Sequence, residues 1–297
     1  MANNLIGLNY TEICALIEFR IVCDSACDLS CEMLCERGVT CVPLSYSFDD
    51  GGTVDSADFY NRMRHGRVAK TTGANVEAFR AAFTTILEEG IDILYLGFSS
   101  ALSMTYNSAR IAAGELRHEY QERRIITIDS LCASAGIALL LDRILAFSDL
   151  DKAARYAEKT KLKICHLFTV DNLDYLKRGG RISPTTAMVG NMLGIKPMLF
   201  VDKSGRLIPG AKVRGRHKAI ERLAEDFESL HEENDVYISH ADCLSDAEAL
   251  GEILTTKYNA NLRLITNIGP VIGSHSGPGT LALFFIGRER PPSKTGD

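Results

Sequence analysis

Short apolar runs alternate with longer amphipathic stretches along most of the chain, and this alternation constrains the fold more than any single motif. In the first half, strand-like runs occupy residues 19–23, 39–48, 91–98 and 124–129. Apolar residues with helical spacing follow these runs at residues 28–36, 56–65, 76–89, 100–120 and 133–148. Strands that alternate with helices build a parallel sheet covered on both faces. We therefore predict a parallel-sheet α/β domain in this half.

The pattern changes after residue 162. Residues 202–205 (DKSG) look like a hairpin turn between two strands, so this half is predicted to hold a mixed sheet. The predicted fold class is α/β with two domains, a parallel-sheet N-terminal domain and a mixed-sheet C-terminal domain. Its parts are an N-terminal extension at residues 1–18 and domains at residues 19–162 and 163–297. Strands are expected at residues 163–170, 195–201, 206–211, 235–240, 261–267 and 281–286, and helices at residues 172–177, 184–193, 216–232 and 245–258. The polar tail after residue 287 is expected to fray.

Composition limits the function classes. The 297 residues are 46% hydrophobic and 24% charged, which suits a globular protein with a sizeable core and room for an apolar cavity. The net charge of −5 argues against a nucleic-acid binder, although local basic patches remain. No uncharged apolar run is long enough to span a membrane. Residues 1–19 contain Glu12 and Glu18 and lack a basic start, which argues against a signal peptide.

The cysteines bear on both location and chemistry. Nine cysteines without a secretion signal predict a reducing, cytoplasmic location. Cys23, Cys27, Cys31 and Cys35 are spaced four residues apart. The favoured interpretation is structural, with Cys31 and Cys35 on one helix face as small buried hydrophobes, and no metal ligand is assigned. The alternative is a metal-binding or redox-responsive site built on this run.

Two hydroxyl-rich segments are candidates for binding an anion. Ser99 and Ser100 follow the strongest strand and are expected to open a long helix, where free N–H groups and the helix dipole favour a small anion. The alternative is that one serine simply caps the helix. The glycine-rich phosphate-binding motifs are absent, so nucleotide phosphate is not indicated. Thr71 is expected in a loop and cap before a helix, and it becomes interesting if its hydroxyl faces the serines.

Two basic segments are candidates for contact with a ligand or a partner. Gly179 and Gly180 are flanked by Lys177, Arg178 and Arg181, and glycines let a backbone approach a ligand closely. Residues 212–218 (KVRGRHK) are a candidate patch for phosphate, an acidic protein or an anionic membrane surface. A solvated turn and a solvated helix start are the respective alternatives.

A glycine- and proline-rich loop is expected at residues 268–279 (IGPVIGSHSGPG), and it contains His275. A histidine held in such a loop is well placed to meet a ligand. Ser100 and His275 could in principle form a nucleophile and base, which would make the chain an acyl-ester hydrolase or transferase. No third group that would orient the histidine is marked, and the H-E-x-x-H and G-x-S-x-G motifs are absent.

Taken in order, these segments resemble the DegV family. The resemblance rests on residues 21–29 (IVCDSACDL), 99–106 (SSALSMTY), 128–130 (IDS), 174–182 (DYLKRGGRI), 195–197 (IKP), 212–215 (KVRG) and 268–279. Each motif is weak alone, but their order and joint presence are specific, and they extend over residues 19–287. The resemblance implies two α/β domains with a long-chain fatty acid in a deep pocket between them.

The resemblance also implies roles for individual residues. Thr71 and Ser100 would donate hydrogen bonds to the fatty-acid carboxylate, with Ser99 close by, and His275 and Arg181 would lie near the head group. Such a protein is not an enzyme, carries no catalytic residue and needs no cofactor besides the bound lipid. It would be a lipid carrier that presents the acyl group to a separate fatty-acid kinase. The basic residues expected to dock the kinase, or to touch a membrane transiently, are Lys212, Arg214 and Arg216.

The sequence departs from the family pattern near the expected head group. Ala101 and Met104 replace the glycines of the usual Ser-Ser-Gly-Leu-Ser-Gly-Thr, and Cys23 replaces the usual threonine before Asp24. The segment at Thr71 reads Thr-Thr-Gly-Ala, where Thr-Ser-Gln-Pro is common. These changes put the individual hydrogen-bond donors in question rather than the fold.

Overall fold

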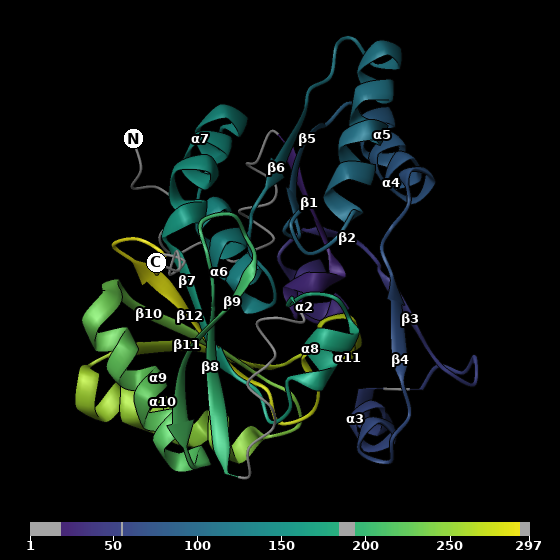
Figure 1. The fold of residues 1–297 in the computed structure, drawn as a ribbon. Coiled ribbons are helices and arrows are strands. Elements are labelled where there is room, and N and C mark those ends of the chain that lie inside the picture. Colours follow the sequence, from purple (N-terminus) through teal and green to yellow (C-terminus); the bar gives the residue numbers. More distant parts are fainter. Residues whose placement is uncertain (1–18, 55, 184–193, 292–297) are drawn as a thin grey trace.

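The first half of the chain forms a four-stranded parallel sheet. The computed structural model describes residues 19–54, 56–183 and 194–291 (Figure 1). The strand order is β2-β1-β5-β6, and every neighbouring pair is parallel. The predicted parallel sheet is therefore confirmed. Its strands are β1 (Phe19–Asp24), β2 (Thr40–Val42), β5 (Asp92–Gly97) and β6 (Ile125–Asp129).

Side chains alternate across this sheet, as the two-residue period of a strand requires. Val22 and Tyr95 pack with α4 (Val76–Glu88) and α5 (Thr105–Glu119) on one face. Cys23 and Leu96 point to the other face, where they share a core with α6 (Ala135–Ile144) and α7 (Leu150–Thr160). Helices therefore cover both faces, which explains why the strands read as continuous apolar runs.

The second half forms a six-stranded mixed sheet in the order β11-β10-β12-β7-β8-β9. Only β10 and β11 are parallel to each other, and the other neighbours are antiparallel, which confirms the predicted mixed sheet. Helices α9 (Arg216–Leu230) and α10 (Leu244–Tyr258) cover one face. The strands are β7 (Ile164–Thr169), β8 (Ile195–Val201), β9 (Leu207–Arg214), β10 (His231–His240), β11 (Asn261–Asn267) and β12 (Leu281–Gly287).

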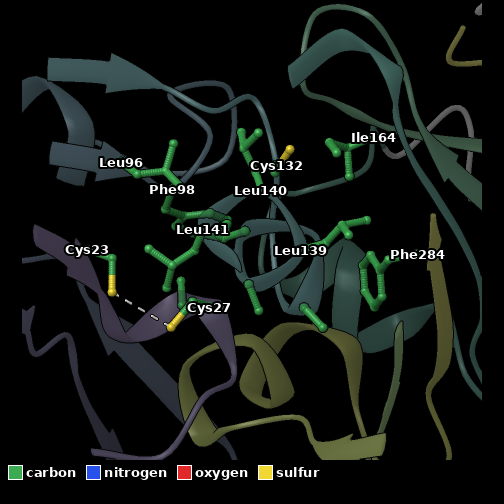
Figure 2. Packing of buried hydrophobic residues seen from close by; sticks show 14 of the residues in the cluster. Cys23, Cys27, Leu96, Phe98, Cys132, Leu139, Leu140, Leu141, Ile164 and Phe284 are labelled. Atoms are coloured by element: carbon green, nitrogen blue, oxygen red, sulfur yellow. Dashed lines mark hydrogen bonds between the residues drawn. The ribbon is translucent and has the colours of Figure 1, made fainter. Parts of the chain in front are cut away.

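Helix α6 lies between the two sheets and joins their cores (Figure 1). All residues from Ala135 to Leu141 are buried, because β5 lies on one side of the helix and β7, β10 and β12 lie on the other. Figure 2 shows Leu139, Leu140 and Leu141 packed between Leu96 and Phe284. A helix that is apolar all round is stable only when buried in this way.

A small outlying unit completes the first half. Strands β3 (Ser45–Phe48) and β4 (Ala69–Thr72) form an antiparallel pair, and α3 (Ser56–Arg64) lies between them in sequence. The rings of Tyr46, Phe48 and Phe59 pack edge to face or tilted within this unit. The predicted single strand at residues 39–48 is thus wrong, since it divides into β2 and β3. The loop expected at Thr71 is instead strand β4, which contacts α11 (Pro270–Ser276).

Several local predictions differ from the structure. Helix α5 begins at Thr105 rather than near Ser100, because residues 99–104 form hydrogen-bonded turns. The glycine-rich loop contains helix α11, which has Pro270 in its first turn. The helix expected at residues 184–193 lies outside the described residues.

The remaining short helices are η1 (Ser25–Cys27), α2 (Cys31–Glu36), η2 (Lys161–Lys163) and α8 (Asp174–Arg178).

Cys31 and Cys35 are both exposed on α2, so the prediction that they are buried hydrophobes was wrong. The expectation that the tail after residue 287 frays was also wrong at Arg290, which is fully buried. No helix in the described ranges has the length and apolar character needed to cross a bilayer.

Candidate functional site

A cavity of about 270 Å³ lies between the two halves of the chain. Its wall is mostly apolar, with Phe98 from the first half and Phe168 and Phe284 from the second. Val271 and Ile272 of α11 add to the wall, so this short helix runs along the cavity. The carboxyl ends of parallel strands are where open α/β sheets bind ligands, and Phe98 directly follows β5. The arrangement suits a long apolar molecule.

Three polar side chains lie together in the cavity wall, and the region that they form is called the polar end of the cavity. Thr71 Oγ1 of β4 and His275 Nε2 of α11 are hydrogen-bonded at 2.7 Å, and both residues line the cavity. Arg181 also lines it and is fixed by two backbone carbonyls, with Nε donating to Leu102 at 3.1 Å and Nη1 donating to Gly179 at 2.6 Å. The structure thus brings together three of the residues predicted from the sequence.

Gly179 supports this polar end by its lack of a side chain. A Cβ atom at Gly179 would lie 2.2 Å from His275 Nδ1, well inside van der Waals contact. The backbone of the Gly-Gly turn therefore packs directly against the imidazole ring, as only glycine permits. The turn therefore positions the histidine that lines the cavity.

The electrostatics of this end favour an anion. Burial, and secondly the charge of Arg181, lower the pKa of His275 to about 4, so the ring is neutral at pH 7. Burial also lowers the pKa of Arg181, but a guanidinium remains charged in proteins. Among the described residues, no carboxylate forms an ion pair with Arg181. A half-buried cation without a counter-ion, beside a hydroxyl and an imidazole, can bind a carboxylate strongly.

Ser99 and Ser100 are not in the cavity wall. Ser99 is buried, and its hydroxyl donates to the Gly205 carbonyl at 2.9 Å. Ser100 is exposed, and its backbone N–H donates to Asp129 at 3.1 Å. Ser103, which was not singled out from the sequence, does line the cavity and is hydrogen-bonded to Thr105 at 2.8 Å. Its place in the Ser-rich segment was the available signal.

A second polar group lies near the start of α11. Asp28 accepts hydrogen bonds from the Ser134 hydroxyl and from the backbone N–H of Gly269, the latter at 2.9 Å. Ser134 also contacts Ser239 at 3.1 Å and lines the cavity. Burial raises the pKa of Asp28 to about 7, against the opposing effect of these hydrogen bonds. The carboxyl group therefore changes charge near neutral pH.

His166 forms a further polar part of the wall. Its Nδ1 is 2.9 Å from the Ile164 carbonyl, and its Nε2 accepts the Ala133 N–H at 3.2 Å. Burial lowers the pKa of His166 far below its usual value, so the ring is neutral. No sequence signal marks this residue, because it stands within an apolar strand.

The predicted docking residues divide into two kinds. Lys212 and Arg214 are exposed on β9, which is the edge strand of the mixed sheet. Arg216 is less exposed and pairs with Asp246 at 2.8 Å and with Asp171 at 3.7 Å. Arg216 therefore already has counter-ions within the chain.

The alternative hypotheses receive no support from these contacts. His275 has Thr71 as its hydrogen-bond partner among the described residues, and Ser100 is exposed and absent from the cavity wall that contains His275. The Ser100–His275 hydrolase therefore lacks the contact on which it depends. Within the described ranges, no group of three or more histidine, cysteine or acidic side chains is arranged to hold a metal ion.

Comparison with known proteins gives consistent matches over nearly the whole chain. Residues 18–288 match the model of the DegV family. A DegV domain-containing protein from Clostridium perfringens is 41% identical over 93% of this chain and 99% of its own length. A DegV lipid-binding protein from Thermotoga maritima has a TM-score of 0.81 at 30% identity, covering 93% of this chain and 100% of that one. A stearic acid-binding protein from Eubacterium ventriosum has a TM-score of 0.80 at 26% identity, covering 90% and 98%.

Proposed function

The chain belongs to the DegV family, and from this premise we propose that it binds one long-chain fatty acid in the cavity between its two sheets. The single observation that carries the proposal is an apolar cavity with Thr71, His275 and Arg181 gathered at one end. A fatty acid has the matching form, a long apolar tail with one anionic head. The stearic acid bound by the Eubacterium ventriosum protein supports this ligand class.

The tail would supply most of the binding free energy. Each CH₂ group removed from water stabilises the complex by about 0.8 kcal/mol, less the cost of ordering the chain. Phe98, Phe168 and Phe284 would contact the tail. Chain length and unsaturation then depend on the shape of this wall, because apolar contacts are non-directional.

The head group is proposed to lie at Thr71, His275 and Arg181. A buried carboxylate needs several donors. The Thr71 hydroxyl can donate to it while accepting the His275 Nε2–H, and the Arg181 guanidinium can supply a charge-assisted donor. Ser103 is proposed as a further contact for the carboxylate, because it also lines the cavity. Ser99 and Ser100 are proposed to act indirectly, by holding the turn between β5 and α5 against Gly205 and Asp129.

The protein is proposed to act as a carrier that does no covalent chemistry on its cargo. A separate fatty-acid kinase would receive the acyl group, as the family resemblance implies. The exposed cations Lys212 and Arg214 are the proposed contacts for this partner. Arg216 is less suitable, because its pairs with Asp246 and Asp171 would have to break.

Mass spectrometry of small molecules extracted from the purified protein tests the proposal. Near-stoichiometric fatty acid is expected in protein prepared without added lipid. The double variant Thr71→Ala/Arg181→Gln should lose most of it. Thr72→Ala is the matched control, because Thr72 is the exposed neighbour of Thr71 on β4 and should keep its cargo. Folded protein that neither retains a fatty acid nor takes one up would refute the proposal.

A further inference from the structure

Three thiols meet at the end of the N-terminal sheet. Cys23 of β1 and Cys27 of η1 are fully buried, with their Sγ atoms 4.0 Å apart (Figure 2). Cys41 of β2 is the direct neighbour of Cys23 in the parallel pair of strands. Neighbouring strands lie about 4.8 Å apart, within the Cα separation that a disulfide spans. Cys23 therefore lies between two other thiols, those of Cys27 and Cys41.

The turn between Cys23 and Cys27 holds the cavity wall at three points. Phe98 donates its backbone N–H to Asp24 at 2.9 Å. Leu44 donates its N–H to the Ser25 hydroxyl at 2.9 Å, and Ser134 donates its N–H to the Ala26 carbonyl at 2.8 Å. All three donors belong to residues that line the cavity. A change in the conformation of this five-residue turn would therefore alter the hydrogen bonds that hold three residues of the cavity wall.

The same turn continues to α11. Asp28, directly after Cys27, accepts the N–H of Gly269 at 2.9 Å, and Thr266 donates its hydroxyl to the Asp28 carbonyl at 2.8 Å. Helix α11 follows Gly269 and carries His275 at the polar end of the cavity. The turn is thus connected to both the apolar wall and the proposed head-group site.

The three thiols differ in access and in acidity. Cys41 is partly exposed, whereas Cys23 and Cys27 are shielded from solvent. A hydrogen bond from Cys23 lowers the pKa of the Cys41 thiol, against the opposing effect of its burial. Hydrogen bonds to Cys27 and Cys41, together with burial, raise the pKa of Cys23. Because the thiolate is the nucleophile, Cys41 is the thiol that meets an oxidant first.

We propose that Cys23, Cys27 and Cys41 form a site of reversible oxidation, in which a peroxide converts Cys23 and Cys27 to a disulfide by way of Cys41. The Cys41 thiolate attacks hydrogen peroxide, the O–O bond breaks, and a sulfenic acid and hydroxide result. The Cys23 thiol attacks the Cys41 sulfur and releases water, which leaves a Cys23–Cys41 disulfide. The Cys27 thiolate then attacks the Cys23 sulfur and displaces the Cys41 thiolate. Overall, two thiols lose two electrons and the peroxide becomes two waters.

The consequence for cargo rests on the proposed fatty-acid function. A disulfide requires the two sulfurs to approach to about 2 Å, so the turn must tighten from the reduced separation of 4.0 Å. This movement shifts the acceptors that hold Phe98, Leu44 and Ser134. The oxidised protein is therefore expected to release its fatty acid faster than the reduced protein.

The thiol chemistry is tested first and without any lipid. The parent protein should be Cys31→Ser/Cys35→Ser, since these two exposed thiols would otherwise react with the oxidant. Treatment with hydrogen peroxide should lower its mass by about 2 Da and yield a Cys23–Cys27 disulfide peptide, reversed by dithiothreitol. Cys27→Ser should trap the Cys23–Cys41 disulfide, and Cys41→Ser should slow the reaction. A folded parent protein that forms no disulfide at Cys23 would overturn the proposal.

Cargo release is then measured on the same preparation. Reduced and oxidised protein loaded with a fluorescent long-chain fatty acid should differ at least about threefold in release rate, and dithiothreitol should remove the difference. The comparison is between the reduced and oxidised forms of one protein, so a folding defect of a variant cannot imitate the result. Equal release rates, with the disulfide present, would overturn the coupling to cargo. A reduced protein that binds no fatty acid would refute the carrier function but leave the oxidation site standing.

Discussion

Thr71 Oγ1 and His275 Nε2 lie 2.7 Å apart although 204 residues separate them in the chain. Their hydrogen bond joins the outlying β3–β4 unit to helix α11, and both side chains face the same cavity. The contact positions a hydroxyl and a neutral imidazole beside Arg181. A bound carboxylate would meet a donor from each half of the chain, so ligand binding would also hold the two halves together.

Protonation of His275 should lower the free energy of unfolding as the pH falls. Its pKa in the folded chain is about 4, below the unfolded value of about 6.5. A depressed pKa contributes stability that is present above the unfolded pKa and is lost as pH falls through the folded pKa. Other buried groups also titrate in this range, so the contribution is read as the difference between wild type and His275→Gln. Denaturant unfolding of ligand-free protein should show a loss of about 2 kcal/mol from His275 between pH 7 and pH 4. His275→Gln should reduce this loss, and an unchanged pH profile would contradict the assignment.

Asp28 should produce the opposite pH dependence. Burial raises its folded pKa to about 7, above the unfolded value of about 3.9. The contribution of the protonated group is therefore fully present below pH 4 and is lost as pH rises through 7. Asp28→Asn keeps an acceptor for Gly269 and removes the ionisation. This variant should gain about 1–3 kcal/mol relative to wild type at pH 8, with little difference at pH 4, measured by denaturant unfolding.

The strands and most helices could be predicted from the sequence, because burial of one or both faces leaves a period in the apolar residues. Features fixed by distant contacts could not. Ser99, Ser100 and Ser103 are all competent helix caps, and the start of α5 at Thr105 depends on Gly205 and Asp129 elsewhere in the fold. Helix α11 was missed because its glycines resemble a loop, whereas its first turn is held by Asp28 from the far end of the sequence.

The candidate site could be predicted in part. Thr71, Arg181 and His275 were marked by local composition and by the family resemblance, and the structure gathers them around one cavity. His166 and the Asp28–Ser134 pair were not marked as site residues, because a buried polar group is recognised only when its partners are known. Arg290 reads as part of a solvated charged tail, although its carbonyl partners come from several elements.

Gly179→Ala should disturb the head-group site without unfolding the chain. The added Cβ would lie 2.2 Å from His275 Nδ1, so the imidazole must shift and its hydrogen bond with Thr71 is disturbed. Loss of a hydrogen bond to the ligand predicts roughly tenfold weaker fatty-acid binding, measured by titration of a fluorescent acid. Gly114→Ala is the control, because its Cβ meets no atom within 4 Å in α5 and alanine favours a helix. Equal affinity in both variants would contradict the proposed role of His275.

Arg290 should be among the most stabilising polar side chains of the protein. It is fully buried, and its guanidinium donates to the carbonyls of Ile164, Leu131, Asp202 and Lys161 at 2.7–3.0 Å. Arg290→Met keeps much of the volume but leaves these buried acceptors unpaired, at a cost of about 3–5 kcal/mol in the free energy of unfolding. Arg288→Met is the matched control, because Arg288 is exposed two residues earlier, and its loss should cost less than about 0.5 kcal/mol. Because Leu131 belongs to the first half and Asp202 to the second, Arg290→Met should also lower the temperature at which both sheets unfold together. Similar unfolding midpoints for the two variants would show that the buried guanidinium contributes no net stability.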